Sequence, residues 1–318
     1  DNTNLDGNIY ITYGDEFYDT GFAPEWYDLS SENTRLDFDW TYHSKSGHKL
    51  KAGYEHTITE IQVLDIDEPW SGSSGFGANY DNYKAKTYFG AFYIQDRISF
   101  QGMTLNFGFR TDYWIPGRYV ENAILDTNSI IITDQARDLF FKETYKMPWF
   151  GDPYRIKARL SPRFGISHPI TDNDVLYFYY GHFSQLPTFQ YVYAKINSKS
   201  QSTYQVFGNP NLDPKTTVQY ELGVKHKFSE DQVLELKAYW KDMFDYETSQ
   251  TIRPSNPKYA YLSFNMYFNA DYARARGVEA LLKSRLFTNW FIDFNFNYSI
   301  VNGKSSSTNY NLLVQAGQ

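Results

Sequence analysis

The sequence contains no cysteine among its 318 residues. That absence excludes a disulfide framework and any metal site built on thiolates, and it leaves the cellular compartment open. Long apolar runs are also missing, because no stretch approaches the roughly 20 consecutive apolar residues that a spanning helix requires. If the chain crosses a membrane, it therefore does so with β-strands.

Basic residues are too few to suggest a nucleic acid partner. The 30 Lys and Arg residues are outnumbered by 37 Asp and Glu residues, for a net charge of −7, whereas nucleic-acid-binding domains carry basic patches. Catalytic signatures are missing too, since no nucleophile motif, phosphate-binding glycine loop or zinc spacing occurs. The six histidines are scattered without metal-ligand spacing. We therefore expect no enzymatic activity, no cofactor and no metal site.

Aromatic residues, in contrast, are abundant. They make up 19% of the chain, with 29 Tyr and 25 Phe, yet the mean hydropathy is a polar −0.58. A membrane β-barrel combines these features, because one strand face meets lipid, the other meets water, and Tyr and Trp gather at both interfaces.

The sequence alternates with a period of two residues almost throughout. In 36–43 the even positions are apolar or aromatic and the odd ones polar, and the same scheme runs through 103–114 and 290–300. Side chains alternate across a strand, so each run has one apolar and one wet face. We predict eleven strands, near Leu5–Tyr13, Arg35–His43, Lys49–Thr59, Lys86–Phe100, Met103–Trp114, Ile156–His168, Asp174–Ser184, Thr217–Phe228, Gln232–Tyr246, Tyr272–Arg285 and Trp290–Val301.

The connections between these strands alternate in length. Short ones, such as Gln101-Gly102, are followed by long ones, predicted at Gly14–Thr34, Glu60–Ala85, Ile115–Arg155, Gln185–Thr216 and Glu247–Asp271. Outer-membrane barrels have short periplasmic turns and long extracellular loops. A soluble sandwich or propeller is the alternative, but it would have short strands and turns at regular 8–12-residue spacing.

Two features predict that the barrel domain, residues 1–318, is incomplete. An odd strand number is unusual for a bacterial single-chain barrel, and the sequence stops inside what the alternation makes a further outer loop. No signal peptide stands at Asp1, so the chain is expected to be mature, truncated or the inner part of a longer protein.

Three segments resemble the barrel of TonB-dependent outer-membrane receptors. They are LSPRFGISHPITDNDVLYFYYGHFSQLPTF at 160–189, GNPNLDPKTTVQYELGVKH at 208–226 and RARGVEALLK at 274–283. Each is degenerate alone, and their order and spacing carry the resemblance. It implies an all-β antiparallel meander forming part of a large transmembrane barrel, about 11 of about 22 strands.

The resemblance also implies a function and partners. Such receptors sit in the outer membrane of Gram-negative-type cells and take up scarce, bulky ligands (iron–siderophore chelates, cobalamin or glycans). A plug domain fills the lumen, TonB delivers the energy, and some receptors carry a lipoprotein lid. The 318 residues show no plug, no TonB box and no terminal strand with a closing aromatic residue, so contact with the TonB system is expected through a plug outside them.

The alternation also predicts which way the side chains point. Apolar side chains expected to face outer-membrane lipid are those of Phe38, Trp40, Phe107, Phe109, Leu236, Trp240, Phe294 and Phe296. Polar groups expected to face the lumen include Asp37, Arg110, Glu235 and Asn295. Lumen charges are expected to pair with each other and with a plug, although a selectivity filter is an alternative. Asp96 and Asp242 interrupt the lipid face and are expected near the headgroups.

Rings in the long connections are the candidates for ligand binding, because exposed rings on loops stack on sugars or planar ligands. The candidates are Trp26, Tyr27, Trp70, Tyr80, Trp149, Phe150, Tyr191 and Tyr193. Packing of loop against loop is the alternative use of such rings.

Three functions remain open from the sequence. The first is active uptake of an unidentified small molecule, glycan or peptide by a TonB-dependent receptor. The second is a passive porin. The third is a structural or adhesive outer-membrane protein whose long loops bind a partner.

Overall fold

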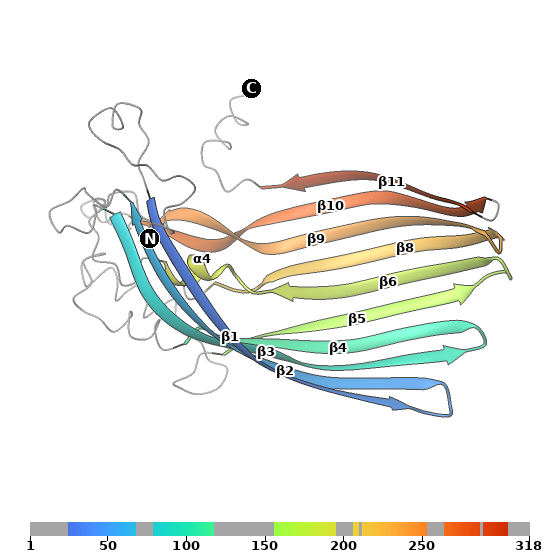
Figure 1. Cartoon of the computed structure of the whole chain (residues 1–318), viewed down its shortest axis with the longest axis horizontal. Helices are drawn as coiled ribbons and strands as arrows, with labels where there is room; N and C mark the ends of the chain where they lie inside the picture. Colours follow the sequence, from blue (N-terminus) through green and yellow to red (C-terminus); the bar gives the residue numbers. More distant parts are fainter. Residues whose placement is uncertain are drawn as a thin grey trace, which may run out of the picture.

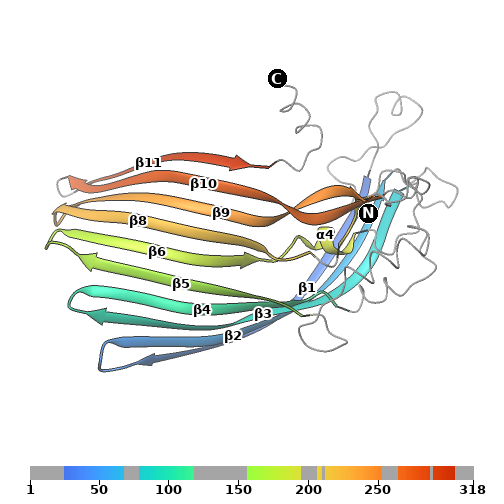
Figure 2. The same cartoon turned by 180° about the vertical axis from the view of Figure 1, so that it is seen from behind.

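One curved sheet dominates the computed structural model, which describes residues 25–67, 79–117, 156–194, 206–209, 212–252, 264–286 and 289–304. The sheet has 11 strands, and all but β7 follow one another in chain order (Figure 1, and Figure 2 from behind). The strands in this order are β1 (Glu25–His43), β2 (His48–Asp67), β3 (Asn79–Phe100), β4 (Met103–Ile115), β5 (Lys157–Pro169), β6 (Asp174–Gln185), β8 (Lys215–Ser229), β9 (Gln232–Ile252), β10 (Phe264–Leu286) and β11 (Trp290–Gly303). The short strand β7 (Val206–Phe207) runs parallel to β10, and α4 (Phe189–Tyr193) is a single helical turn.

The predicted antiparallel meander is confirmed, since every other strand pair is antiparallel. Short turns lie at one end of the sheet and the strand ends that lead to long connections lie at the other (Figure 1). Between β3 and β4, Gln101 and Gly102 have φ of 48° and 79°. Two positive φ values are the signature of the tight hairpin turn that suits twisted strands. Among the described helices, none is long and apolar enough to span a membrane.

Ten of the eleven predicted strands are present, and Leu5–Tyr13 lies outside the described residues. The strands extend further towards the long connections than predicted: β1 begins at Glu25, β2 ends at Asp67 and β3 begins at Asn79. The loops predicted over 25–34, 60–67 and 79–85 are therefore wrong. The β1–β2 register continues without a break to Glu25↔Asp67, so the backbone groups keep their partners. The sequence concealed this because 30–33 is polar on both faces.

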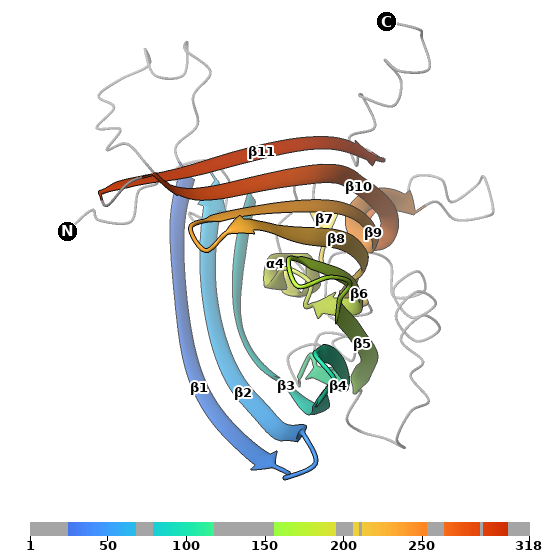
Figure 3. The same cartoon turned by 90° about the vertical axis from the view of Figure 1, so that its right-hand side faces the viewer.

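The part of the sheet that the structure describes is rolled but does not close. Figure 3 shows β1–β3 forming one wall and β8–β11 curving over the top of it. Within the described residues, β1 pairs only with β2 and β11 pairs only with β10. The last predicted strand, Trp290–Val301, is thus paired on one side only within the described residues, as expected for an incomplete barrel, whereas the first predicted strand, Leu5–Tyr13, lies outside them.

The concave face of the sheet can be identified from α4, which lies inside the curve (Figure 3). The buried cluster around α4 includes Ile61, Tyr83 and Trp114. Following the register from these three residues places Asp37, Arg110, Glu235 and Asn295 on the same concave face. The side chains predicted to point outward lie on the convex face, where Phe38 and Phe109 have exposed fractions of 62% and 52%. The predicted facing is confirmed.

Asp96 and Asp242 lie on the convex face, and each has a basic partner. The Asp96 carboxylate is 2.7 Å from Nδ1 of His48. The Asp242 carboxylate accepts hydrogen bonds from Nε of Arg274 at 2.6 Å and from the Trp240 indole at 2.9 Å. Pairing lowers the free-energy penalty of a carboxylate on a lipid-facing surface.

Candidate functional site

Ion pairs cross the concave face from strand to strand. Arg110 on β4 donates from Nη1 and Nη2 to the two carboxylate oxygens of Glu55 on β2, at 3.1 and 2.8 Å. Its side chain crosses β3 at Ala91, which pairs with Glu55 on β2 and with Asp112 on β4 and is fully buried. Its Nε also donates to Asp112 at 2.7 Å. A small residue on the middle strand thus leaves room for a bidentate charged bridge, the stronger kind of hydrogen bond.

A second set of ion pairs occupies the concave face of β8, β9 and β10. Nζ of Lys225 lies 3.1 Å from Glu235, and Nζ of Lys237 lies 2.7 Å from Glu279. The hydroxyl of Tyr177 on β6 donates to Glu235 at 2.6 Å. The predicted pairing of lumen charges with one another is confirmed for these residues.

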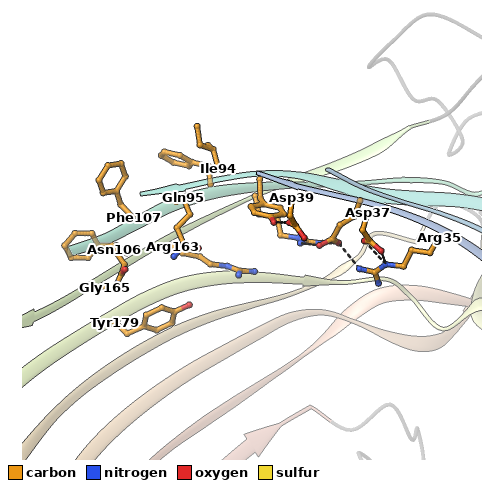
Figure 4. A pocket seen from close by; sticks show the side chains of 16 residues that line it. Arg35, Asp37, Asp39, Ile94, Gln95, Asn106, Phe107, Arg163, Gly165 and Tyr179 are labelled. Atoms are coloured by element: carbon orange, nitrogen blue, oxygen red, sulfur yellow. Dashed lines mark hydrogen bonds and ion pairs between the residues drawn. The ribbon is translucent and has the colours of Figure 1, made fainter. Parts of the chain in front are cut away.

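The concave side of β1 to β6 holds a hollow of about 590 Å³ (Figure 4). Side chains from six strands, β1 to β6, line it, among them Asp39, Gln95, Asn106, Arg163 and Tyr179. The lining carries charges of both signs, from the basic Arg35, Arg110 and Arg163 and the acidic Asp37, Asp39 and Glu55. Among the described residues, no group of three His, Asp or Glu side chains could hold a metal ion.

A shelf projects into the concave side near the long connections. We define the shelf as residues 186–194 together with 206–209 and 212–214. Its apolar side chains Val192, Tyr193, Phe207 and Leu212 are buried against Ile61, Val63, Tyr83, Ala85, Trp114 and Met266. The Tyr193 hydroxyl donates to the carbonyl oxygen of Pro116 at 2.7 Å. This apolar contact fixes α4 against the wall formed by β2, β3 and β4.

Polar bonds hold the other side of the shelf. Nζ of Lys157, at the start of β5, donates to the carbonyl oxygen of Leu212 at 2.7 Å and to Asp213 at 3.0 Å. Lys157 is buried, so these two acceptors satisfy an ammonium group that has little contact with water. The Asn209 amide donates to the carbonyl oxygen of Tyr267 on β10 at 2.8 Å. The shelf is therefore tied to both walls.

The structure separates the candidate ligand-binding rings. Trp26 and Tyr27 are on β1 and Tyr80 is on β3, with β2 between them. Tyr191 and Tyr193 come together on α4. Trp70, Trp149 and Phe150 lie outside the described residues.

The expectation that Tyr193 is exposed is wrong, because its ring has no exposed surface. The helical turn places Tyr193 against the wall, and its neighbour Tyr191 instead stacks on Tyr267, with ring centroids 4.4 Å apart. Sequence reasoning missed Tyr267 because it treated 247–271 as a connection, although its polar–apolar alternation continues in part through 264–269.

Comparison with known proteins identifies the family. The family model described as "TonB dependent receptor-like, beta-barrel" matches residues 1–315. The chain belongs to this family. Its members are outer-membrane receptors and transporters rather than enzymes. No curated protein matches the sequence.

Solved structures share the fold of this TonB-dependent receptor-like barrel. "Copper transporter OprC" is 14% identical, with a TM-score of 0.56 over 88% of this chain and 39% of its own. The FrpB iron transporter from Neisseria meningitidis is 13% identical, with a TM-score of 0.56 over 90% of this chain and 37% of its own. The Serratia marcescens hemophore receptor HasR, solved with its hemophore HasA and heme, is 16% identical, with a TM-score of 0.55 over 87% of this chain and 43% of its own. The chain thus spans about two fifths of the length of these proteins. At these identities the similarity concerns the fold alone.

In a TonB-dependent receptor-like barrel of this shape, the concave face is the lumen wall and the convex face meets lipid. The ion pairs, the hollow and the shelf accordingly all lie on the lumen side.

Proposed function

We propose that this chain is the lumen wall of an active-transport receptor in the outer membrane of a Gram-negative-type cell. The receptor takes up a scarce, bulky ligand (an iron–siderophore chelate, cobalamin or a glycan) with energy delivered by TonB. The match to the TonB-dependent receptor barrel over residues 1–315 carries this proposal. The TonB system would act through a plug domain that fills the lumen, and a lipoprotein lid is a further partner of the proposed receptor.

The shelf supports active uptake over a passive porin. It occupies the concave side with a packed apolar cluster, including Val192 and Leu212, neither of which has exposed surface. Porins instead keep a polar, water-filled channel. A shelf of this kind narrows the lumen, which suits a gated receptor better than a channel for free diffusion.

Binding of a protein partner at the loop end is the second candidate. HasR is solved in complex with the protein HasA, so a barrel of this fold can bind a protein. The rings of Trp26, Tyr27, Trp70, Tyr80, Trp149, Phe150, Tyr191 and Tyr193 are the proposed contacts for either kind of ligand. Tyr193, being buried, would act by holding α4 in place.

Uptake in cells tests the proposal. Cells that express the full-length protein are given radiolabelled ferric siderophores, cobalamin or oligosaccharides in the presence and absence of functional TonB. We expect accumulation of one ligand class that disappears without TonB. Accumulation of small solutes that is independent of TonB would favour the porin, and binding without any accumulation would favour the adhesive function.

A ring substitution refines the same assay. Tyr27→Ala, at the loop end of β1, is expected to weaken binding, because stacked rings contribute strongly to such contacts. Tyr42→Ala is the matched control, since Tyr42 lies on the same strand but on the convex face near the short turn. Equal effects of the two changes would count against binding at the loop end.

A further inference from the structure

Arg163 on β5 differs from the neighbouring arginines of the lumen wall. Arg110 is paired with Glu55 at 2.8 Å, and Arg159 is paired with Asp245 at 2.6 Å. Arg163 has no carboxylate within ion-pairing distance among the described residues, and no dashed line reaches it in Figure 4. Arg97 on the same face is exposed near the short turns, where water satisfies its donors.

The surroundings of Arg163 hold the guanidinium in place without neutralising it. Its Cζ lies 4.8 Å from the centroid of the Phe183 ring, a cation–π contact. Its Nε–H is buried and meets no acceptor among the described residues. A buried donor of a charged group without an acceptor is costly. The position is therefore suited to an incoming group that only accepts hydrogen bonds.

Arg163 also stands where the sheet divides. The β4–β5 ladder continues to Lys157, at the loop end. The β5–β6 ladder runs only from Pro169↔Val175 to Arg163↔Gly181. Towards the loops from Arg163, the two strands separate (Figure 1). Arg163 thus sits at the apex of the opening and lines the hollow next to it.

The chemistry of the hollow selects among anions. Gln95, Asn106 and Tyr179 offer uncharged donors beside Arg163. Across the hollow, Asp37 and Glu55 already have arginine partners, and Asp39 accepts from the Tyr93 hydroxyl. These three carboxylates would repel a dianion more than a monoanion. A guanidinium fork binds a single carboxylate in bidentate fashion.

We propose that Arg163 is a carboxylate-binding residue of the lumen wall, with Gln95, Asn106 and Tyr179 completing the site. The carboxylate comes either from a dissolved ligand or from an acidic side chain of a polypeptide segment that occupies the lumen. The site does not depend on the proposed transport function, because a porin wall would hold a carboxylate equally well.

The test uses the full-length protein purified in detergent, in wild-type form and with Arg163→Gln. Arg97→Gln, an arginine substitution on the same face, is the matched control. Saturation-transfer NMR measures binding of propionate, a monoanion, of its uncharged amide propionamide and of methyl phosphate, largely a dianion above pH 7, at equal ionic strength. Thermal unfolding without any added anion is measured in parallel.

If the carboxylate comes from solution, propionate binds the wild type and Arg97→Gln. Its signal then falls at least about five-fold in Arg163→Gln, as expected for the loss of a charge-assisted bond. If an internal segment supplies it, propionate does not bind, but Arg163→Gln lowers the unfolding temperature. Arg97→Gln does not, and Arg163→Lys restores part of the loss.

Three results would overturn the proposal. One is that Arg163→Gln and Arg97→Gln behave alike in both measurements. Another is that propionamide or methyl phosphate binds as well as propionate. The last is that Asp39→Asn removes the effect of Arg163→Gln on stability, because Asp39 would then be the partner of Arg163 and no further carboxylate would be needed.

Discussion

The ring of Tyr177 on β6 covers Gly223, its direct partner on β8, so closely that a Cβ at Gly223 would lie 2.3 Å from the ring. The same arrangement recurs on the concave face where Tyr93 covers Gly53. A glycine in a strand has no side chain to pack, and a neighbouring ring can compensate by covering it. From this position the Tyr177 hydroxyl reaches Glu235 at 2.6 Å. The glycine thus determines where a lumen-facing hydrogen bond forms.

Gly223→Ala is expected to destabilise the protein by about 1–3 kcal/mol, the usual effect of overpacking. The new methyl group would displace the Tyr177 ring and break its bond to Glu235. Gly165→Ala is the control, because its Cβ would meet no atom closer than 3.6 Å. Urea unfolding of the full-length protein in lipid vesicles measures both. Equal destabilisation of the two variants would show that the position of the Tyr177 ring does not require a glycine at 223.

Phe109→Arg tests which face of β4 meets lipid. Phe109 is exposed on the convex face near the middle of the strand. An arginine on the lipid face near mid-membrane destabilises a barrel by about 2–4 kcal/mol. Asn106→Arg, on the concave face of the same strand, is expected to change the stability by much less. The free energy of unfolding in vesicles distinguishes them, and a larger loss for Asn106→Arg would reverse the assignment of the faces.

Strand faces could be predicted from the sequence because each depends on a local alternation. Phe38 beside Asp37, and Phe296 beside Asn295, reveal the two faces without any tertiary information. The Gln101-Gly102 turn was likewise predictable, because a glycine there accommodates a positive φ.

The shelf could not be predicted, because its bonds join residues that are distant in the sequence. Lys157 reaches Leu212, and Tyr193 reaches Pro116. Nothing in the local sequence shows that Tyr193 is buried while Tyr191, two residues earlier, stacks at the edge of the cluster. The sequence therefore places rings near the long connections but does not rank them by exposure, and the binding role of these rings stays a prediction.

Tyr193→Phe tests the anchoring of the shelf. The change removes one hydroxyl and leaves the Pro116 carbonyl without its donor in a buried site, for an expected loss of about 1–3 kcal/mol. Tyr191→Phe is the control, since the Tyr191 hydroxyl makes no hydrogen bond to the described residues. Hydrogen exchange of the amides in 189–194 measures the local effect. Unchanged protection in Tyr193→Phe would show that apolar packing alone holds α4.

The bridge from Arg110 to Glu55 gives the final prediction. Both side chains keep only about a quarter of their surface exposed, at 26% and 27%, so water screens the pair less than it would at an open surface. Glu55→Gln is expected to lower the stability by about 1–3 kcal/mol, because two charge-assisted bonds weaken while Asp112 still partners Arg110. A double-mutant cycle with Arg110→Gln should give a coupling of about 1–2 kcal/mol. Glu60→Gln on the same strand is the control, because its partner Lys84 is largely exposed, and it should alter the unfolding free energy less. A coupling near zero would mean that the bidentate bridge adds nothing to the cohesion of β2, β3 and β4.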